Sequence, residues 1–261
     1  MKVTRASDDT FTGWCAEGGR GRIFGGQVAA QALQAAGRRL RCERAPHSLH
    51  LYFLRPGDPN RSVTYSVSTL RDGRTFSTFQ VRACQGERII LTAVASFTRT
   101  ENSVEYQVVM PTTEDPEACP VDDFAPPNTN IEVRNPLEFR TAMRHAEPAP
   151  ATPSQHVWFR SRLPLSDGDL EHACVLTYAT DLSLPLTAHL PLHSLDDYHA
   201  GASLDHTLWF HRPIRADEWL LFELSSTSYA AARGLSHGKL FDRAGHLVAS
   251  AAQESLIRMP L

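Results

Sequence analysis

The spacing of hydrophobic residues changes from a helical to an alternating pattern within the first hundred residues. Residues 23–40 place large apolar side chains at intervals among many alanines, with few charges before Arg38. This pattern predicts a mostly buried helix that opens at Gly25-Gly26. Alternating positions and short apolar runs between turn signals then predict strands over residues 48–54, 63–70, 75–84 and 88–98. The first part of the chain is therefore predicted to be one helix followed by an antiparallel meander.

A similar order of elements returns after residues 105–130, a segment rich in proline and acidic residues that we interpret as a linker. The second copy is predicted to start at residues 131–140, and its later strands are predicted at 156–163, 203–210, 219–226, 231–241 and 246–257. Between the first two of these, residues 169–181 are predicted to be helical or turn-like. A shorter, proline-interrupted helix is predicted over residues 182–195.

The two halves also share sequence. Residues 50–56 align with residues 207–213, and both segments read aromatic-Phe-x-Arg-Pro. Self-similarity of this length predicts two copies of one fold packed together. We therefore predict an α+β fold of the double hotdog type, with two tandem hotdog repeats that each wrap a curved antiparallel sheet around a central helix. The predicted domains are residues 1–104 and 131–261. The Arg-Pro pairs occur in both halves and are assigned to turn structure.

Composition excludes several classes of function. The formal net charge is −3 without a basic stripe, which argues against a nucleic-acid partner. No stretch reaches 18 apolar residues and the N-terminus lacks the apolar region of a signal peptide, so no membrane association is expected. The five cysteines are dispersed without CxxC spacing, which predicts free thiols and a cytoplasmic protein.

The two halves differ where the second carries polar residues that the first lacks. Gln253 lies in the apolar run 247–253, and its counterpart in the first half is Ala95. A glutamine buried in a strand must find hydrogen-bond partners or it costs stability. This asymmetry points to a functional site in the second half.

The chain resembles the acyl-CoA thioesterase II family. The resemblance is carried by residues 24–28, 47–58, 70–73, 204–213 and 232–234, and it covers most of the chain outside the linker and the proline-rich loops. It implies a double hotdog enzyme that hydrolyses acyl-CoA to a fatty acid and free CoA, without a cofactor or metal. It also implies a catalytic set of Asp181, Ser203 and Gln253. Members of such families associate further, so a homo-oligomer is expected.

These residue types suit thioester hydrolysis. Asp181 can accept a proton from water, and we expect it just before the helix over 182–195, near the positive helix end. Ser203, at a strand start, and Gln253 can hold that water by donating and accepting hydrogen bonds. The developing oxyanion needs preorganised donors. We hypothesise that Gly25 and Gly26, which open the first helix, face this site across the pseudo-twofold axis and bind substrate there.

Other motifs receive weaker interpretations. Residues 234–238 read G-x-S-x-G, but a nucleophile elbow needs a strand-turn-helix with Asp and His later in the chain. Only 25 residues follow Ser236, and they read as a hairpin. His189 and His193 have helical spacing but Pro191 lies between them, which argues against a zinc site. Asp205 and His206 are assigned structural roles at a strand start. Residues 18–21 form a glycine-rich loop without the frame of a P-loop.

Two alternative functions stay open. One is a catalytically weak protein that binds or senses acyl-CoA. The other is hydratase or dehydratase chemistry on the same fold, although no Asp-x-Asn-Pro-x-His motif is present.

Overall fold

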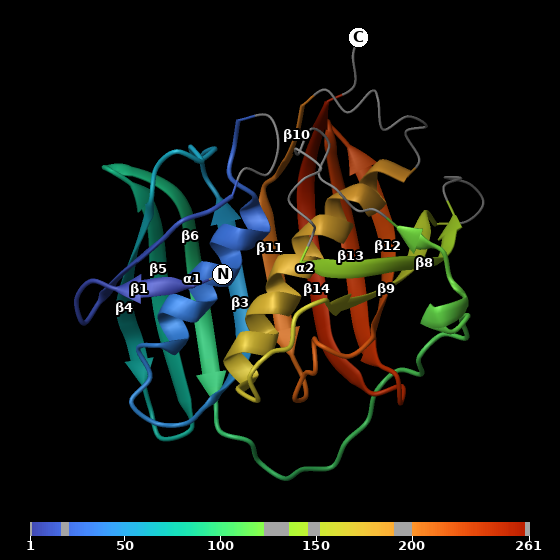
Figure 1. The fold of residues 1–261 in the computed structure, drawn as a ribbon, viewed down its shortest axis with the longest axis horizontal. Helices are drawn as coiled ribbons and strands as arrows, with labels where there is room; N and C mark the ends of the chain where they lie inside the picture. The colour runs from blue at the N-terminus through green and yellow to red at the C-terminus, as the bar shows by residue number, and fades with distance from the viewer. Residues whose placement is uncertain (1, 17–20, 123–135, 146–151, 191–199, 259–261) are drawn as a thin grey trace.

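Two helices lie side by side on the same face of one large antiparallel sheet (Figure 1). The computed structural model describes residues 2–16, 21–122, 136–145, 152–190 and 200–258. The helices are α1 (Gly25–Gly37) and α2 (Asp169–His189), and η1 (Pro116–Ala118) is a short 3-10 turn. The strands are β1 (Val3–Arg5), β2 (Thr10–Gly13), β3 (Ala45–Phe53), β4 (Val63–Asp72), β5 (Phe76–Gln85), β6 (Arg88–Thr98), β7 (Val121–Asp122), β8 (Leu137–His145), β9 (Ser154–Ser161), β10 (Ala200–Ser203), β11 (Asp205–Phe210), β12 (Leu220–Ala230), β13 (Arg233–Asp242) and β14 (Leu247–Arg258).

The sheet records the duplication. Its strand order is β1-β2-β4-β5-β6-β3-β11-β14-β13-β12-β9-β8-β7, and β10 pairs with β14. The order β4-β5-β6-β3 on one side of the centre is repeated in reverse as β11-β14-β13-β12 on the other. The two copies join where β3 pairs antiparallel with β11, with Leu49 opposite Leu208. The equivalent strand of each repeat therefore forms the seam.

Small residues let the two helices approach each other closely. The alanines of α1 are buried, and so is Leu33 on the same helix. A Cβ added to Gly26 would lie 2.9 Å from the carbonyl oxygen of Tyr178, and one added to Gly37 would lie 2.5 Å from the Leu170 side chain. At Gly26 the contact is with backbone, so glycine there limits the distance between α1 and α2, whereas at Gly37 the flexible Leu170 side chain can move aside.

The four predicted strands of the first meander are confirmed, and α1 is shorter than the predicted 23–40. In the second half, the predicted strand 203–210 is two strands, β10 and β11, so Ser203 ends a strand and does not start one. The prediction of its helices was also wrong. Residues 169–189 form one helix with Pro185 inside it, instead of two segments that break near Asp181. Pro185 removes a single backbone donor, and burial of the helix on both sides of it keeps the helix continuous. The end of the predicted segment 182–195 lies outside the described residues.

No helix in the described part of the chain is long and apolar enough to cross a membrane. All five cysteines are free thiols.

Candidate active site

The three predicted catalytic residues come together from three elements. Asp181 lies in the middle of α2, Ser203 ends β10, and Gln253 lies on the inner face of β14. Inward-facing positions of β14 alternate along the strand, which places Gln253 towards α2. Asp181 is therefore not at a helix start, as the sequence had suggested. The helix end next to it is that of α1, which begins at Gly25.

The side chains form a closed set of hydrogen bonds. Ser203 Oγ donates to Asp181 Oδ1 over 2.8 Å. Gln253 Nε2 donates to the same carboxylate oxygen over 2.8 Å and to Ser203 Oγ over 2.6 Å. The participating groups on Asp181 and Gln253 are almost fully buried. The serine and the glutamine therefore fix the carboxylate from two sides.

Burial sets the charge of this site. Desolvation raises the pKa of Asp181 to about 6, although hydrogen bonds from Ser203, Gln253 and the backbone N–H of Gly26 act to lower it. Tyr178 on the same helix is the nearby titratable group, and burial raises its pKa to about 12, so that it stays neutral. No cation among the described residues forms an ion pair with Asp181. A buried carboxylate with a pKa near neutrality is suited to act as a general base.

The first-half glycines reach this site. A Cβ built on Gly25 would lie 2.9 Å from Asp181 Oδ2 and 2.9 Å from the ring of Phe53. The backbone N–H of Gly26 stabilises the charged form of Asp181. The start of α1 thus faces the second-half residues, and a side chain at Gly25 would displace the carboxylate.

His206 contacts Gln253 of the site. The sequence had predicted only a structural role for it at a strand start. The side chain is fully buried, with Nδ1 2.6 Å from Gln253 Oε1 and Nε2 3.0 Å from Thr180 Oγ1. Burial lowers the pKa of His206 to about 4, so the ring is neutral near pH 7. Asp205 instead accepts the backbone N–H of Glu254, which fits a structural role. Sequence reasoning missed Thr180, which stands directly before Asp181.

The remaining motifs do not join this site. Residues 234–238 lie within strand β13, and Ser236 is buried there, so the strand-turn-helix of a nucleophile elbow is absent from this segment. Arg55 and Arg212 each donate to a strand carbonyl, that of Ile89 or Leu247, as expected for turn residues. Within the described residues no group of three metal-ligating side chains forms. His193 and residues 18–20 lie outside the described residues.

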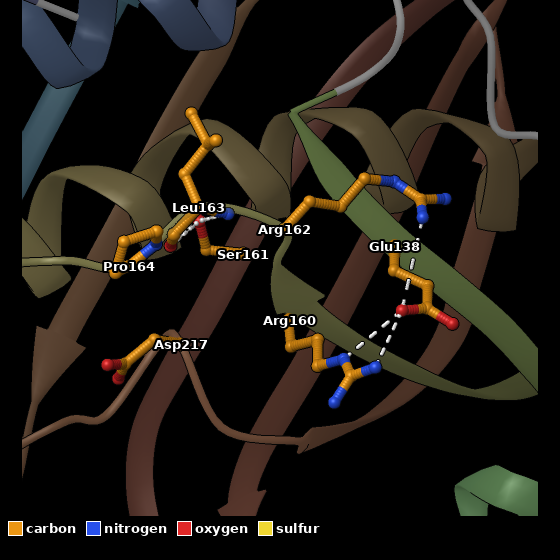
Figure 2. A pocket seen from close by; sticks show the side chains of 7 residues that line it. All are labelled: Glu138, Arg160, Ser161, Arg162, Leu163, Pro164 and Asp217. Carbon is orange, nitrogen blue, oxygen red and sulfur yellow. Dashed lines mark hydrogen bonds and ion pairs between the residues drawn. The ribbon is translucent and has the colours of Figure 1, made fainter.

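A wide surface cavity of about 510 Å³ lies elsewhere, beside β8 and β9 (Figure 2). Its charged groups are already paired: Glu138 accepts two hydrogen bonds from Arg160, at 2.9 and 3.1 Å, and two from Arg140. The Arg160 guanidinium also lies over the Trp219 ring, 4.4 Å from its centroid. This pairing identifies a structural ion cluster, and the candidate chemistry stays at Asp181.

Both halves of the chain match models of one known family. The acyl-CoA thioesterase N-terminal domain matches residues 12–98, and the acyl-CoA thioesterase C-terminal domain matches residues 116–257. The chain belongs to the acyl-CoA thioesterase family. The family predicted from the sequence is therefore confirmed.

Individual relatives support the same assignment. The chain is 37% identical to human acyl-coenzyme A thioesterase 8 over 91% of this chain and 81% of that protein. It is 35% identical to acyl-CoA thioesterase 2 of Haemophilus influenzae, over 99% of this chain and 95% of that protein. The crystal structure of the acyl-CoA thioesterase II TesB2 from Mycobacterium marinum superposes with a TM-score of 0.85 at 36% identity, covering 99% of this chain and 96% of that one.

A protein with a hot dog fold from Alicyclobacillus acidocaldarius superposes with a TM-score of 0.82 at 19% identity, covering 100% of this chain and 97% of that one. This likeness concerns the fold alone. Together with the duplicated sheet and its two helices, it confirms the predicted double hotdog.

Proposed function

We propose that this thioesterase hydrolyses acyl-CoA by activating a water molecule with Asp181, Ser203 and Gln253. The observation that carries the proposal is the convergence of Ser203 Oγ and Gln253 Nε2 on one buried carboxylate oxygen, Asp181 Oδ1. Membership of the acyl-CoA thioesterase family supplies the substrate class. The residues provide a base and two polar groups that hold the base in place.

The reaction is balanced by one proton that Asp181 takes and returns. Water beside Asp181, whose carboxylate Ser203 and Gln253 hold in place, attacks the thioester carbonyl carbon, and its proton moves to that carboxylate. The tetrahedral intermediate then collapses with cleavage of the C–S bond. The thiolate of CoA receives the proton from Asp181, and the fatty acid and the CoA thiol then leave the site. Asp181 is thereby regenerated for the next turnover.

The developing oxyanion is assigned to the start of α1. The partial positive charge of a helix N-terminus and its free N–H groups favour an anion. Gly25 and Gly26 lie there beside Asp181, and glycine lets a substrate carbonyl approach the backbone closely. The Gly26 N–H donates to the charged Asp181 carboxylate, so in this proposal it turns to the oxyanion as Asp181 takes up the proton. This assignment completes the site from both repeats: the base from the second and the oxyanion donors from the first.

The test is release of free CoA thiol from acetyl-CoA to palmitoyl-CoA, followed with a thiol-reactive dye, for the wild type and Asp181→Ala. We expect kcat to fall on the order of 10²-fold or more in the variant, the loss typical of a general base. Thermal unfolding controls for the fold. A folded variant with near-normal turnover would remove Asp181 from the mechanism.

The same assay separates the two alternatives. A protein that only binds acyl-CoA would release no thiol although it retains affinity for the substrate. A hydratase or dehydratase would change the absorbance of an enoyl-CoA without releasing thiol. The expectations of a cytoplasmic protein and a homo-oligomer stay predictions, and light scattering coupled to size exclusion tests the second.

A further inference from the structure

The amide of Gln253 can act on Asp181 only in one of its two orientations. An ionised carboxylate accepts hydrogen bonds and cannot donate them. The end of the amide 2.8 Å from Asp181 Oδ1 must therefore be the NH₂ group, and the carbonyl Oε1 must point away from it. If the amide flipped, its carbonyl would face the carboxylate and Ser203 Oγ, and the donors to both would be lost.

The group behind Gln253 selects this orientation. His206 Nδ1 lies 2.6 Å from Gln253 Oε1, so this nitrogen carries the hydrogen. In the neutral ring Nε2 is then an acceptor, and the Thr180 hydroxyl, 3.0 Å away, is the group that can donate to it. The carbonyl oxygens of Leu176 and Thr177, each 3.1 Å from the same hydroxyl, compete for its one hydrogen, but both belong to the backbone of α2, where helical N–H groups supply donors. Donation therefore runs in one direction, from Thr180 through His206 and Gln253 to Asp181.

We propose that His206, held by Thr180, is a positioning residue that orients the Gln253 amide towards Asp181 and Ser203. The inference rests on the function proposed above, because it concerns how that site is held in its working geometry.

The duplication supports this role independently. In the first repeat, Leu49 on β3 pairs with Ala95 on β6, and both are buried. The register of β11 and β14, with Thr207 opposite Ala252, places His206 opposite Gln253 at the equivalent position. An apolar pair in one repeat is thus a hydrogen-bonded polar pair in the repeat that carries the carboxylate. Packing alone does not require this change, because leucine and alanine fill the same place in the first repeat.

The experiment compares two substitutions of His206. His206→Leu introduces the residue that the first repeat uses, and it removes the donor to Gln253. His206→Asn keeps an N–H group near the position of Nδ1. For one acyl-CoA, kcat, KM and the pH dependence of kcat/KM are measured for both variants, together with thermal unfolding.

For His206→Leu we expect kcat to fall on the order of 10- to 100-fold with little change in KM, as expected when a reacting group is misplaced. The acidic limb of the pH profile should also move to higher pH, because Asp181 loses a donor that stabilises its charge. The other titratable groups near Asp181 are Tyr178 on α2 and His206, and both are neutral near pH 7. From α1, β10 and β14, Asp181 receives uncharged hydrogen-bond donors, namely Gly26, Ser203 and Gln253. His206→Asn should retain most of the wild-type kcat, with the acidic limb of its pH profile near the wild-type position.

His172 provides a matched control. It is another buried histidine, on α2, where it accepts the backbone N–H of Ala216 over 3.1 Å, away from the site. His172→Leu should lower the unfolding temperature without moving the acidic limb. If His206→Leu fails to fold, Thr180→Val and His206→Asn provide the test instead. Thr180→Val should lower kcat and move the acidic limb of the pH profile to higher pH. His206→Asn should keep kcat and the acidic limb near the wild-type values.

Each outcome has one meaning. A wild type that releases no thiol from any acyl-CoA overturns the proposed function, and the positioning role with it. An active wild type alongside a folded His206→Leu variant with unchanged kcat and pH profile overturns the positioning role alone. Equal losses in His206→Leu and His206→Asn, with an unmoved acidic limb, would also overturn it, because a role in packing would then explain both.

Discussion

At the scale of single residues, the burial of Asp181 opposes stability while it favours catalysis. Its pKa of about 6 in the folded chain lies above the ordinary value of 3.8. Folding therefore favours the protonated form. The native state is not penalised below about pH 4, where the unfolded chain is also protonated, and it is penalised increasingly as the pH rises towards 6. A difference of about two pKa units corresponds to about 3 kcal/mol.

Asp181→Asn should remove this pH-dependent penalty, because an amide does not ionise. We expect the free energy of unfolding of the variant, relative to the wild type, to rise by about 2–3 kcal/mol between pH 4 and pH 7.5. Urea unfolding across this range measures it. A constant difference between the two proteins would mean that Asp181 has an ordinary pKa in the fold.

At the scale of the elements, the start of α1 limits what can stand beside the carboxylate. In Gly25→Ala the new Cβ would lie 2.9 Å from Asp181 Oδ2, too close without a shift of that side chain. We expect a large fall in kcat with the fold retained. Gly37→Ala is the matched control on the same helix, since its Cβ meets the flexible Leu170 side chain away from the site. Steady-state kinetics and thermal unfolding of both variants test this, and equal kinetics would contradict it.

Pro185 leaves the backbone carbonyl of Asp181 without its usual hydrogen bond within α2. A proline has no N–H, so it cannot bond to the carbonyl four residues earlier, which is that of Asp181. Pro185→Ala restores this bond, and we expect the unfolding free energy to rise by up to about 3 kcal/mol. The proline ring crowds the Asp181 carbonyl, so its removal should shift Asp181 and kcat should fall at the same time. Pro164→Ala, in the loop before α2, should change neither quantity, and an unchanged kcat in Pro185→Ala would show that the proline is not needed for the geometry.

Helix α2 was harder to predict from the sequence than the strands were. The strands of the meanders could be predicted because alternation and turn residues are local signals. The sequence predicted a break near Asp181 and a proline-interrupted helix after it, but the packing of α2 against α1 and the sheet keeps one continuous helix. Whether a helix continues depends on partners that lie far along the chain, which periodicity does not reveal.

At the scale of the whole molecule, the duplication allowed much of the site to be predicted. Gln253 stood out because Ala95 takes its place in the first repeat. Asp181 and Ser203 came only from the family resemblance, and the structure brings both to Gln253. The contacts of His206 with Gln253 and with Thr180 could not be predicted from local sequence. The first depends on the register between β11 and β14, and the second on the packing of α2 against β11. Comparing the pair Leu49–Ala95 with His206–Gln253 would have provided the signal.

The asymmetry of the two repeats predicts that one polar residue cannot make a second site. In Ala95→Gln a buried amide faces Leu49 without a hydrogen-bond partner. We expect a loss of roughly 1–3 kcal/mol of unfolding free energy from the unsatisfied group. Adding Leu49→His should recover part of this loss, because the ring nitrogen can donate to the new amide as His206 does to Gln253.

No activity should follow in either case. Helix α1 contains no Asp or Glu, so it offers no carboxylate in the place that Asp181 takes on α2. The decisive measurement is thiol release by the double variant in an Asp181→Ala background, with urea unfolding of the single and double variants to obtain their coupling energy. Turnover above the Asp181→Ala level would mean that the polar strand pair suffices without the aspartate. A coupling energy near zero would mean that the histidine and the glutamine do not act as a pair.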